Sequence, residues 1–167
     1  HLVPKYVEIV TDPDLGKLRE EIQNAQDLRS QILFRYLMEQ RKCYGLDFDD
    51  LIMYALYILT EDKEIREKWQ RRIQYEMVDE FQDVNDSQYA LADILSGLHK
   101  NLFVVGDPDQ TIYGWRGAKV FYILEFPKMH TGTKTIVLSQ NYRSSSAVIK
   151  SANSLIRKNR NRFEKDM

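Results

Sequence analysis

The feature of this sequence that most limits its fold is an alternation of short apolar runs with helical segments between residues 75 and 159. The apolar runs are YEMVDEF, NLFVVGD and KTIVLSQN, and each ends in polar residues. The helical segments are SQYALADILSGL, AKVFYILEF and, after the last run, SSAVIKSANSLIRKN. Apolar strands that alternate with helices predict a parallel sheet covered on both faces. We therefore expect an α/β fold in which three polar strand ends meet at one edge, where ligands bind in open sheets.

The part of the chain before this alternation is expected to be helical. Residues 14–42 carry apolar side chains at broadly helical spacing. LDFDDLIMYALYIL predicts a second helix, with Asp47 or Asp49 as its N-cap acid. Residues 63–72 form a charged helical stretch around Trp69. An all-helical segment thus precedes the predicted sheet.

Composition places the chain among ordinary globular proteins. Of its 167 residues, 43% are hydrophobic and 29% are charged, which excludes a disordered chain. No apolar run approaches the roughly 20 residues that a membrane span needs. The single cysteine, Cys43, excludes an intrachain disulfide and suits a cytoplasmic protein. Basic residues outnumber acidic ones from 132 to 167. Such clustering can indicate a surface that binds a polyanion, but more often it belongs to a solvated helix face.

The first predicted strand ends in two adjacent carboxylates within VDEFQD, residues 78–83. An aspartate at the end of a parallel strand, here Asp79, can hold Mg²⁺ through water beside nucleotide phosphates. The next acid, Glu80, could then accept a proton from an attacking water. A pair of solvated acids at a strand end is the simpler reading, and the residues alone leave both open.

The second predicted strand leads into VVGDPDQTIYGWRGA, residues 104–118. Gln110 stands where a strand-end amide could contact a phosphate. Tyr113, Trp115 and Arg116 follow on a glycine-rich turn. Such rings can stack on the bases of a single strand, with about 1–3 kcal/mol per base, while the guanidinium contacts the backbone. The competing reading is that Trp115 fills the core.

The third predicted strand ends in SQNYRSS, residues 139–145. Tyr142 could stack on a base, and the fork of Arg143 suits a phosphate. A helix N-terminus capped by serines explains the serines equally well.

In this order and spacing, these segments resemble motifs II, III and IV of the superfamily 1A DNA helicases of the UvrD, Rep and PcrA type. The matching strings are VDEFQD, VGDPDQTIYGWRGA and LSQNYRSS. LDFDDLIM, residues 46–53, resembles the helix that these helicases carry before motif II. The resemblance covers roughly residues 30–165, and the long string from Gly106 to Ala118 makes it specific.

The resemblance implies roles at the ATP site. Asp79 would hold Mg²⁺, and Glu80 would be the catalytic base that activates water for attack on the γ-phosphate of ATP. Gln110 would sense the γ-phosphate and couple it to DNA contacts. Tyr142 would stack on adenine, and Arg143 would reach the γ-phosphate from the second motor lobe as an internal arginine finger.

The resemblance also implies the DNA track and the activity. Phe48, Tyr113, Trp115 and Arg116 would line the path of the single strand, with Trp115 stacking on a base. Family members are ATP-dependent 3′-to-5′ DNA translocases of DNA repair and replication, which act on single-stranded DNA and at junctions of single- and double-stranded DNA.

The family architecture has two RecA-like lobes, each with a helical insertion. It implies a partial RecA-like parallel sheet with flanking helices in this chain. Residues 1–45 would end the helical insertion of the first lobe. Residues 46–130 would be the distal half of that lobe, and residues 131–167 would begin the second.

The sequence departs from the family in lacking the G-x-x-x-x-G-K-[ST] loop that cradles phosphates. Its only Gly-Lys pair, Gly16-Lys17, lies in a charged stretch without a preceding strand pattern. We therefore expect a section of a longer helicase that hydrolyses ATP negligibly by itself. A non-catalytic single-strand-binding module with a degenerate ATP site is the alternative. A metal-dependent nuclease would instead use Asp79, Glu80, Asp83, Asp107 and Asp109.

Overall fold

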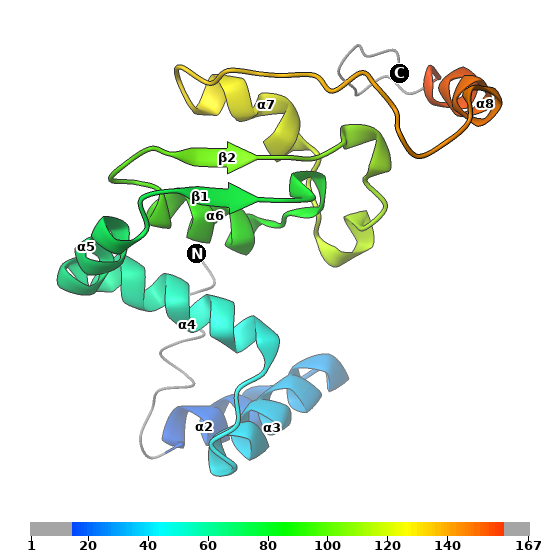
Figure 1. Ribbon diagram of the computed structural model, residues 1–167. Helices are drawn as coiled ribbons and strands as arrows, with labels where there is room; N and C mark the ends of the chain where they lie inside the picture. Colours follow the sequence, from blue (N-terminus) through cyan, green and yellow to red (C-terminus); the bar gives the residue numbers. More distant parts are fainter. Residues whose placement is uncertain (1–14, 159–167) are drawn as a thin grey trace. The chain divides into compact units, whose positions relative to one another are not determined.

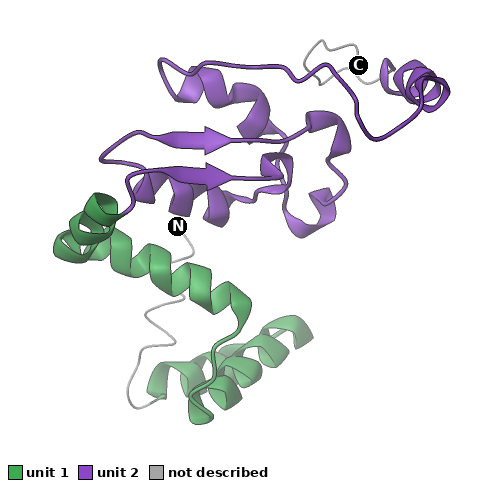
Figure 2. Ribbon diagram, in the orientation of Figure 1, with its two compact units in different colours: residues 1–72 green, residues 73–167 purple. Residues whose placement is uncertain are grey.

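The computed structural model describes residues 15–158, which divide into two compact units. Unit 1 comprises residues 1–72 and unit 2 comprises residues 73–167 (Figure 2). No helix in the described part of the chain is long and apolar enough to cross a membrane.

Unit 1 is helical in its described residues, as the sequence predicts (Figure 1). Its helices are α2 (Gly16–Asn24), α3 (Leu28–Lys42), α4 (Phe48–Glu61) and α5 (Lys63–Arg72). The helix expected over residues 14–42 is wrong as one element, because it is interrupted between α2 and α3. Ala25 is extended, and Asp27 caps α3 by accepting a hydrogen bond from the N–H of Ser30 at 3.0 Å. A short polar side chain that competes for backbone N–H groups favours such a new helix start.

The core of unit 1 lies between α2 and α3. Leu18 and Leu37 are buried there, and partly buried apolar side chains of α3 and α4 pack against them. Helix α4 begins with a capping box: the Asp47 side chain accepts from the N–H of Asp50, and the Asp50 side chain accepts from the N–H of Asp47, both at 2.9 Å. Asp47, one of the two predicted caps, is therefore confirmed as the N-cap.

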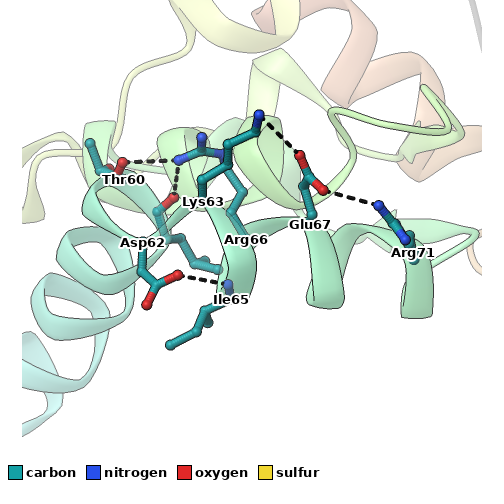
Figure 3. A network of polar contacts seen from close by, with 8 residues as sticks. Thr60, Asp62, Lys63, Ile65, Arg66, Glu67 and Arg71 are labelled. Atoms are coloured by element: carbon teal, nitrogen blue, oxygen red, sulfur yellow. Dashed lines mark hydrogen bonds and ion pairs between the residues drawn. The ribbon is translucent and has the colours of Figure 1, made fainter.

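The connection between α4 and α5 is held by side-chain bonds to the backbone (Figure 3). Asp62 accepts a hydrogen bond from the N–H of Ile65 at 2.9 Å. The guanidinium of Arg66 donates to the carbonyls of Leu59 and Thr60 at 2.7 and 2.9 Å. These two carbonyls lie in the last turn of α4, where carbonyl groups lack helical partners, so Arg66 completes the helix end.

Unit 2 contains a two-stranded parallel sheet, β1 (Glu76–Val78) and β2 (Leu102–Val104), in which Met77 lies opposite Phe103. Figure 1 shows α6 connecting the two strands and α7 following β2. The helices of unit 2 are α6 (Asp86–Leu95), α7 (Phe121–Met129) and α8 (Ser146–Ile156), with short 3-10 helices η1 (Phe81–Asp83), η2 (Pro108–Gln110) and η3 (Gly114–Arg116). This mixed, helix-rich arrangement is compatible with the expected α/β class.

The core of unit 2 joins η1 and α7 to one face of this sheet. Phe81, Val84, Ile123 and Phe126 are buried, and inward-facing side chains of both strands pack against them. The rings of Phe81 and Phe126 meet edge to face with centroids 5.5 Å apart. Residues of the loop after β1 are thus buried in the core, and this burial fixes the position of the loop.

Two predictions about the sheet are wrong. Residues 134–141 form no strand, and Ile136 and Leu138 there are exposed. β-branched and apolar residues favour an extended chain, but a strand also needs a hydrogen-bonded neighbour, and the described residues provide none for this segment. Within residues 15–158 the sheet is also covered on one face only, as the exposures of 78% for Met77 and 58% for Phe103 show.

Candidate functional site

The polar loops after β1 and β2 lie side by side because the strand pairing continues past both strand ends. The N–H of Val105 donates to the carbonyl of Val78, and the N–H of Phe81 donates to the carbonyl of Val105, both at 2.9 Å. Parallel strands bring their carboxyl ends to the same edge of a sheet. The two motif-bearing loops, residues 79–83 and 106–118, thus form one site.

The two predicted acids lie on the first of these loops and are exposed. Glu80 has a φ of 51°, a left-handed conformation that is uncommon for a residue other than glycine. Asp79 Oδ1 accepts the N–H of Glu80 at 2.8 Å, and the carbonyl of Glu80 accepts the N–H of Asp83 at 2.9 Å. A strained backbone held by its neighbours is typical of functional sites. The turn thus keeps both carboxylates in the loop that directly follows β1.

Gln82 is a residue of this site that the sequence interpretation did not select. Its side chain is only 1% exposed, and both ends of its amide are bonded. Nε2 donates to Glu80 Oε2 at 2.8 Å and more distantly to Asp83 Oδ2 at 3.4 Å, while Oε1 accepts the N–H of Asp107 at 3.0 Å. One signal could have identified it, since it is an uncharged amide in a run of acids directly after an apolar strand.

Asp107 and Gln110 are joined at the start of the second loop. Asp107 Oδ1 accepts the N–H of Asp109 at 3.0 Å, and Oδ2 accepts from Gln110 Nε2 at 2.9 Å. The N–H of Gln110 donates to the carbonyl of Asp107 at 2.9 Å. Asp107 therefore fixes η2 and the orientation of the Gln110 side chain.

Gln110 lies beside the third predicted motif. An open hollow of about 480 Å³ is lined by Gln110 together with residues 140–143, which include Tyr142 and Arg143. The Asn141 side chain shapes this segment by accepting the N–H groups of Arg143 and Ser144, both at 2.9 Å. Tyr142 and Arg143 are exposed. Three predicted ATP-site residues therefore line one hollow.

The predicted DNA-contacting residues of the second loop form an exposed cluster of two rings and one cation. Trp115 is 80% exposed, so it does not fill the core. The Tyr113 and Trp115 rings meet edge to face at 6.5 Å, and the Arg116 guanidinium lies 5.7 and 5.5 Å from their centroids. Gly117 follows with a φ of 87° and closes the turn by donating to the carbonyl of Gly114 at 3.0 Å. An accessible aromatic pair with a cation is suited to stacking on bases.

The segment after this cluster is fastened to helix α6 at Asp86. Its carboxylate accepts from Lys119 Nζ at 2.6 Å and from the Tyr122 hydroxyl. The hydrogen bonds from Lys119 and then from Tyr122 lower the pKa of Asp86. Burial, and then the hydrogen bond to Asp86, raise the pKa of Tyr122 to about 12. These two bonds to Asp86 fix the segment that directly follows the GWRG turn, residues 114–117.

A second hollow of about 400 Å³ lies between β1 and α6, on the side of Asp79 and Glu80. Apolar side chains of α6 line it together with Glu76 and Asp83. Burial raises the pKa of Glu76, and its Oε2 has no hydrogen-bond partner within residues 15–158. The charged form of the Glu76 side chain is therefore less favourable at this position than in water.

Asp79 fits a Mg²⁺ ion by its chemistry, because it supplies a hard carboxylate oxygen at a strand end while its other oxygen is held by the N–H of Glu80. The described residues contain no group of three or more His, Cys, Asp or Glu side chains arranged to hold a metal ion. The carboxylate cluster that a nuclease would need is therefore not found within residues 15–158.

Phe48 is the predicted site residue that the structure places in unit 1, whereas the other predicted site residues belong to unit 2. It is the first residue of α4, directly after the Asp47 cap, and its ring is exposed.

The chain is similar to known proteins over most of its length. Residues 7–131 match the UvrD/REP helicase N-terminal domain family. The chain is 46% identical to "ATP-dependent DNA helicase Rep" of Escherichia coli (strain K12), over 75% of this chain and 19% of that protein. It is 39% identical to "ATP-dependent DNA helicase PcrA" of Leuconostoc citreum, over 85% of this chain and 19% of that protein. It is 42% identical to PcrA of Staphylococcus aureus (strain Mu50), over 86% of this chain and 20% of that protein. The chain thus spans about a fifth of the length of these relatives.

Proposed function

The chain belongs to the UvrD/REP helicase family, and from this premise we propose that it is a section of an ATP-dependent DNA helicase. In that protein, ATP hydrolysis drives 3′-to-5′ movement along single-stranded DNA and the unwinding of duplex DNA. Rep and PcrA, to which the chain is similar, carry the name ATP-dependent DNA helicase. The chain alone hydrolyses ATP negligibly.

The observation that carries the proposal is the hollow shared by Gln110, Tyr142 and Arg143. Gln110 lies more than 30 positions before the adjacent Tyr142 and Arg143, and it comes from a different motif of the proposed ATP site. An aromatic ring suits the base of a nucleotide, and an amide and a guanidinium suit its phosphates. Tyr142 stacks on the adenine, while Gln110 and Arg143 bind the γ-phosphate.

The acids at the end of β1 supply the other half of the proposed chemistry. Glu80 accepts the proton of the water that attacks the γ-phosphate. Asp79 holds Mg²⁺ through water, and the ion neutralises charge on the phosphates when bound. Arg143 stabilises the charge that develops on the transferred phosphoryl group, as arginine fingers do in related nucleotide hydrolases.

The exposed cluster of Tyr113, Trp115 and Arg116 forms part of the DNA track, together with Phe48. Trp115 stacks on a base, and Arg116 contacts the phosphate backbone. The cluster starts three residues after Gln110 on the same loop, which supports a direct connection between the γ-phosphate and the DNA. Single-stranded DNA and its junctions with duplex DNA are the proposed partners.

We assign the parts of the chain to the proposed motor as follows. Residues 1–45 end the helical insertion of the first lobe, residues 46–130 form the distal half of that RecA-like lobe, and residues 131–167 begin the second lobe. The parallel pair β1 and β2 supports a RecA-like sheet. We propose a cytoplasmic location, on which the single Cys43 agrees with a reducing compartment.

The test measures ATP hydrolysis by the intact protein with and without a single-stranded oligonucleotide. Glu80→Gln should lower the DNA-stimulated turnover by roughly 10²–10⁴-fold, the contribution of a general base, and should leave nucleotide binding in place. Glu125→Gln removes an acid of α7 that pairs with Lys128 and serves as the matched control with unchanged turnover. Single-strand binding without any ATP turnover in the wild type would favour the alternative of a non-catalytic DNA-binding module.

A further inference from the structure

The proposed base and the proposed phosphate sensor are linked by an unbroken chain of hydrogen bonds. Glu80 Oε2 accepts from Gln82 Nε2 at 2.8 Å, and Gln82 Oε1 accepts the N–H of Asp107 at 3.0 Å. Asp107 Oδ2 then accepts from Gln110 Nε2 at 2.9 Å. The chain crosses from the loop after β1 to the loop after β2 through the buried amide of Gln82.

Only an amide can make both bonds at the Gln82 position. The N–H of Asp107 needs an acceptor, which fixes Oε1 on that side and therefore places the NH₂ group against Glu80. A carboxylate at this position could still accept from Asp107, but it would face Glu80 without a donor. An apolar side chain would leave the N–H of Asp107 unpaired, at the cost of a buried unsatisfied donor.

The distance between the two loops is set by Gly106. A Cβ atom at this position would lie 2.5 Å from Gln82 Oε1 and 3.0 Å from the backbone nitrogen of Phe81. The absence of a side chain at Gly106 therefore lets the Gln82 amide reach the N–H of the next residue, Asp107.

We propose that Gln82 is a positioning residue that orients the Glu80 carboxylate according to the position of the Gln110 loop. The inference rests on the proposed function. It adds a route by which the position of the second loop, residues 106–118, changes the orientation of the catalytic base Glu80. When Gln110 and Asp107 shift, the buried amide shifts with them, because it has no room to turn and, within residues 15–158, its NH₂ group donates only to Glu80 and Asp83. The Glu80 carboxylate then changes its orientation relative to the attacking water. A displacement of a catalytic group by about 1 Å can lower the rate by up to about 100-fold.

The same chain leads toward the proposed DNA track. Gln110 is followed within six residues by Tyr113, Trp115 and Arg116. DNA bound at this cluster would hold the second loop in one position. That position would fix the Gln82 amide, which in turn would orient the Glu80 carboxylate. The positioning role thus accounts for stimulation of hydrolysis by DNA.

The test compares Gln82→Glu with Gln82→Met in the intact protein. Gln82→Glu keeps the acceptor for the N–H of Asp107 and removes the donor to Glu80, whereas Gln82→Met removes both. We expect both variants to lower the DNA-stimulated kcat by about 10- to 100-fold while KM for ATP changes by no more than about threefold. Tyr89→Phe, which loses the hydroxyl contact with the His130 ring nitrogen at 3.1 Å, is the control for reduced stability and should keep its kcat.

A second readout does not depend on turnover. Amide hydrogen exchange at Asp107 should stay slow in Gln82→Glu and become fast in Gln82→Met. A merely structural role predicts that Gln82→Glu, with its Asp107 bond intact, hydrolyses ATP like the wild type, and that result would overturn the inference. If Glu80→Gln keeps its turnover, the proposed function fails instead, and the positioning role fails with it. Reduced kcat in Gln82→Glu with slow exchange at Asp107 supports the inference.

Discussion

Replacing Gly106 with alanine tests whether the two strand-end loops depend on an approach that only glycine permits. The added Cβ would lie 2.5 Å from Gln82 Oε1, 2.9 Å from Ile123 Cδ1 and 3.0 Å from the nitrogen of Phe81. Contacts this short force the neighbours to move, and overpacking of this kind costs about 1–3 kcal/mol. Displacing Gln82 also weakens its bond to the Asp107 N–H, which contributes about 0.5–1.5 kcal/mol.

We therefore expect Gly106→Ala to lower the free energy of unfolding of unit 2 by about 2–4 kcal/mol. The measurement is a urea titration followed by the methyl NMR signals of Val84, a buried residue that reports on this unit alone. Gly114→Ala is the matched control, because a Cβ there meets nothing within 4 Å. The control should change the free energy of unfolding by less than about 0.5 kcal/mol.

A double-mutant cycle with Ile123→Val identifies the cause. This substitution removes the Cδ1 atom that lies 2.9 Å from the added Cβ. Alone it should cost about 0.5–1.5 kcal/mol, and with Gly106→Ala the total should fall short of the sum by at least about 0.5 kcal/mol. Strict additivity, or a cost of Gly106→Ala no larger than that of Gly114→Ala, would refute the reasoning from close approach.

Three further predictions concern other parts of the molecule. Trp115→Ala should weaken binding of a labelled single-stranded oligonucleotide by about 1–3 kcal/mol in fluorescence anisotropy, and equal loss in Trp69→Ala would contradict the assignment. Because burial raises the pKa of Tyr122 from 10.0 to about 12, its contribution to stability is complete below pH 10 and is lost as the pH rises through 12. The urea midpoint of the wild type should therefore fall more steeply than that of Tyr122→Phe over this range. Asp50→Ala should destabilise α4 by about 0.5–2 kcal/mol in thermal melts, and more than Asp27→Ala at the exposed cap of α3, since Asp50 is buried.

The sequence predicted well those features that depend on local chemistry. Asp47 caps α4, the glycine-flanked Trp115 is exposed, and the polar residues after β1 and β2 meet at one edge. Caps, turns and strand ends follow from the preferences of a few neighbouring residues, which a sequence displays directly. The roles of these residues in ATP and DNA binding stay predictions.

Features that depend on distant parts of the chain were missed or wrong. Gln82 reads as one polar residue among acids, and its importance comes from Asp107, which lies 25 positions later. Residues 134–141 have strand-forming composition, yet the described part of the chain offers them no hydrogen-bonded neighbour and they stay irregular. Pairing and burial are properties of the whole fold, so intrinsic preference alone could not decide either case.

The uncovered face of the sheet in unit 2 bears on the proposed function. Apart from Glu76, the residues of both strands are apolar on both faces, a pattern typical of strands that lie inside a larger parallel sheet. The described residues of unit 2 cover only one face, and Met77 and Phe103, paired in register, form an exposed apolar patch on the other. A two-stranded sheet is at best marginally stable, and exposed apolar patches commonly mark contact surfaces. The chain spans about a fifth of the length of its relatives, and in the proposed helicase we expect other parts of the protein to cover this face.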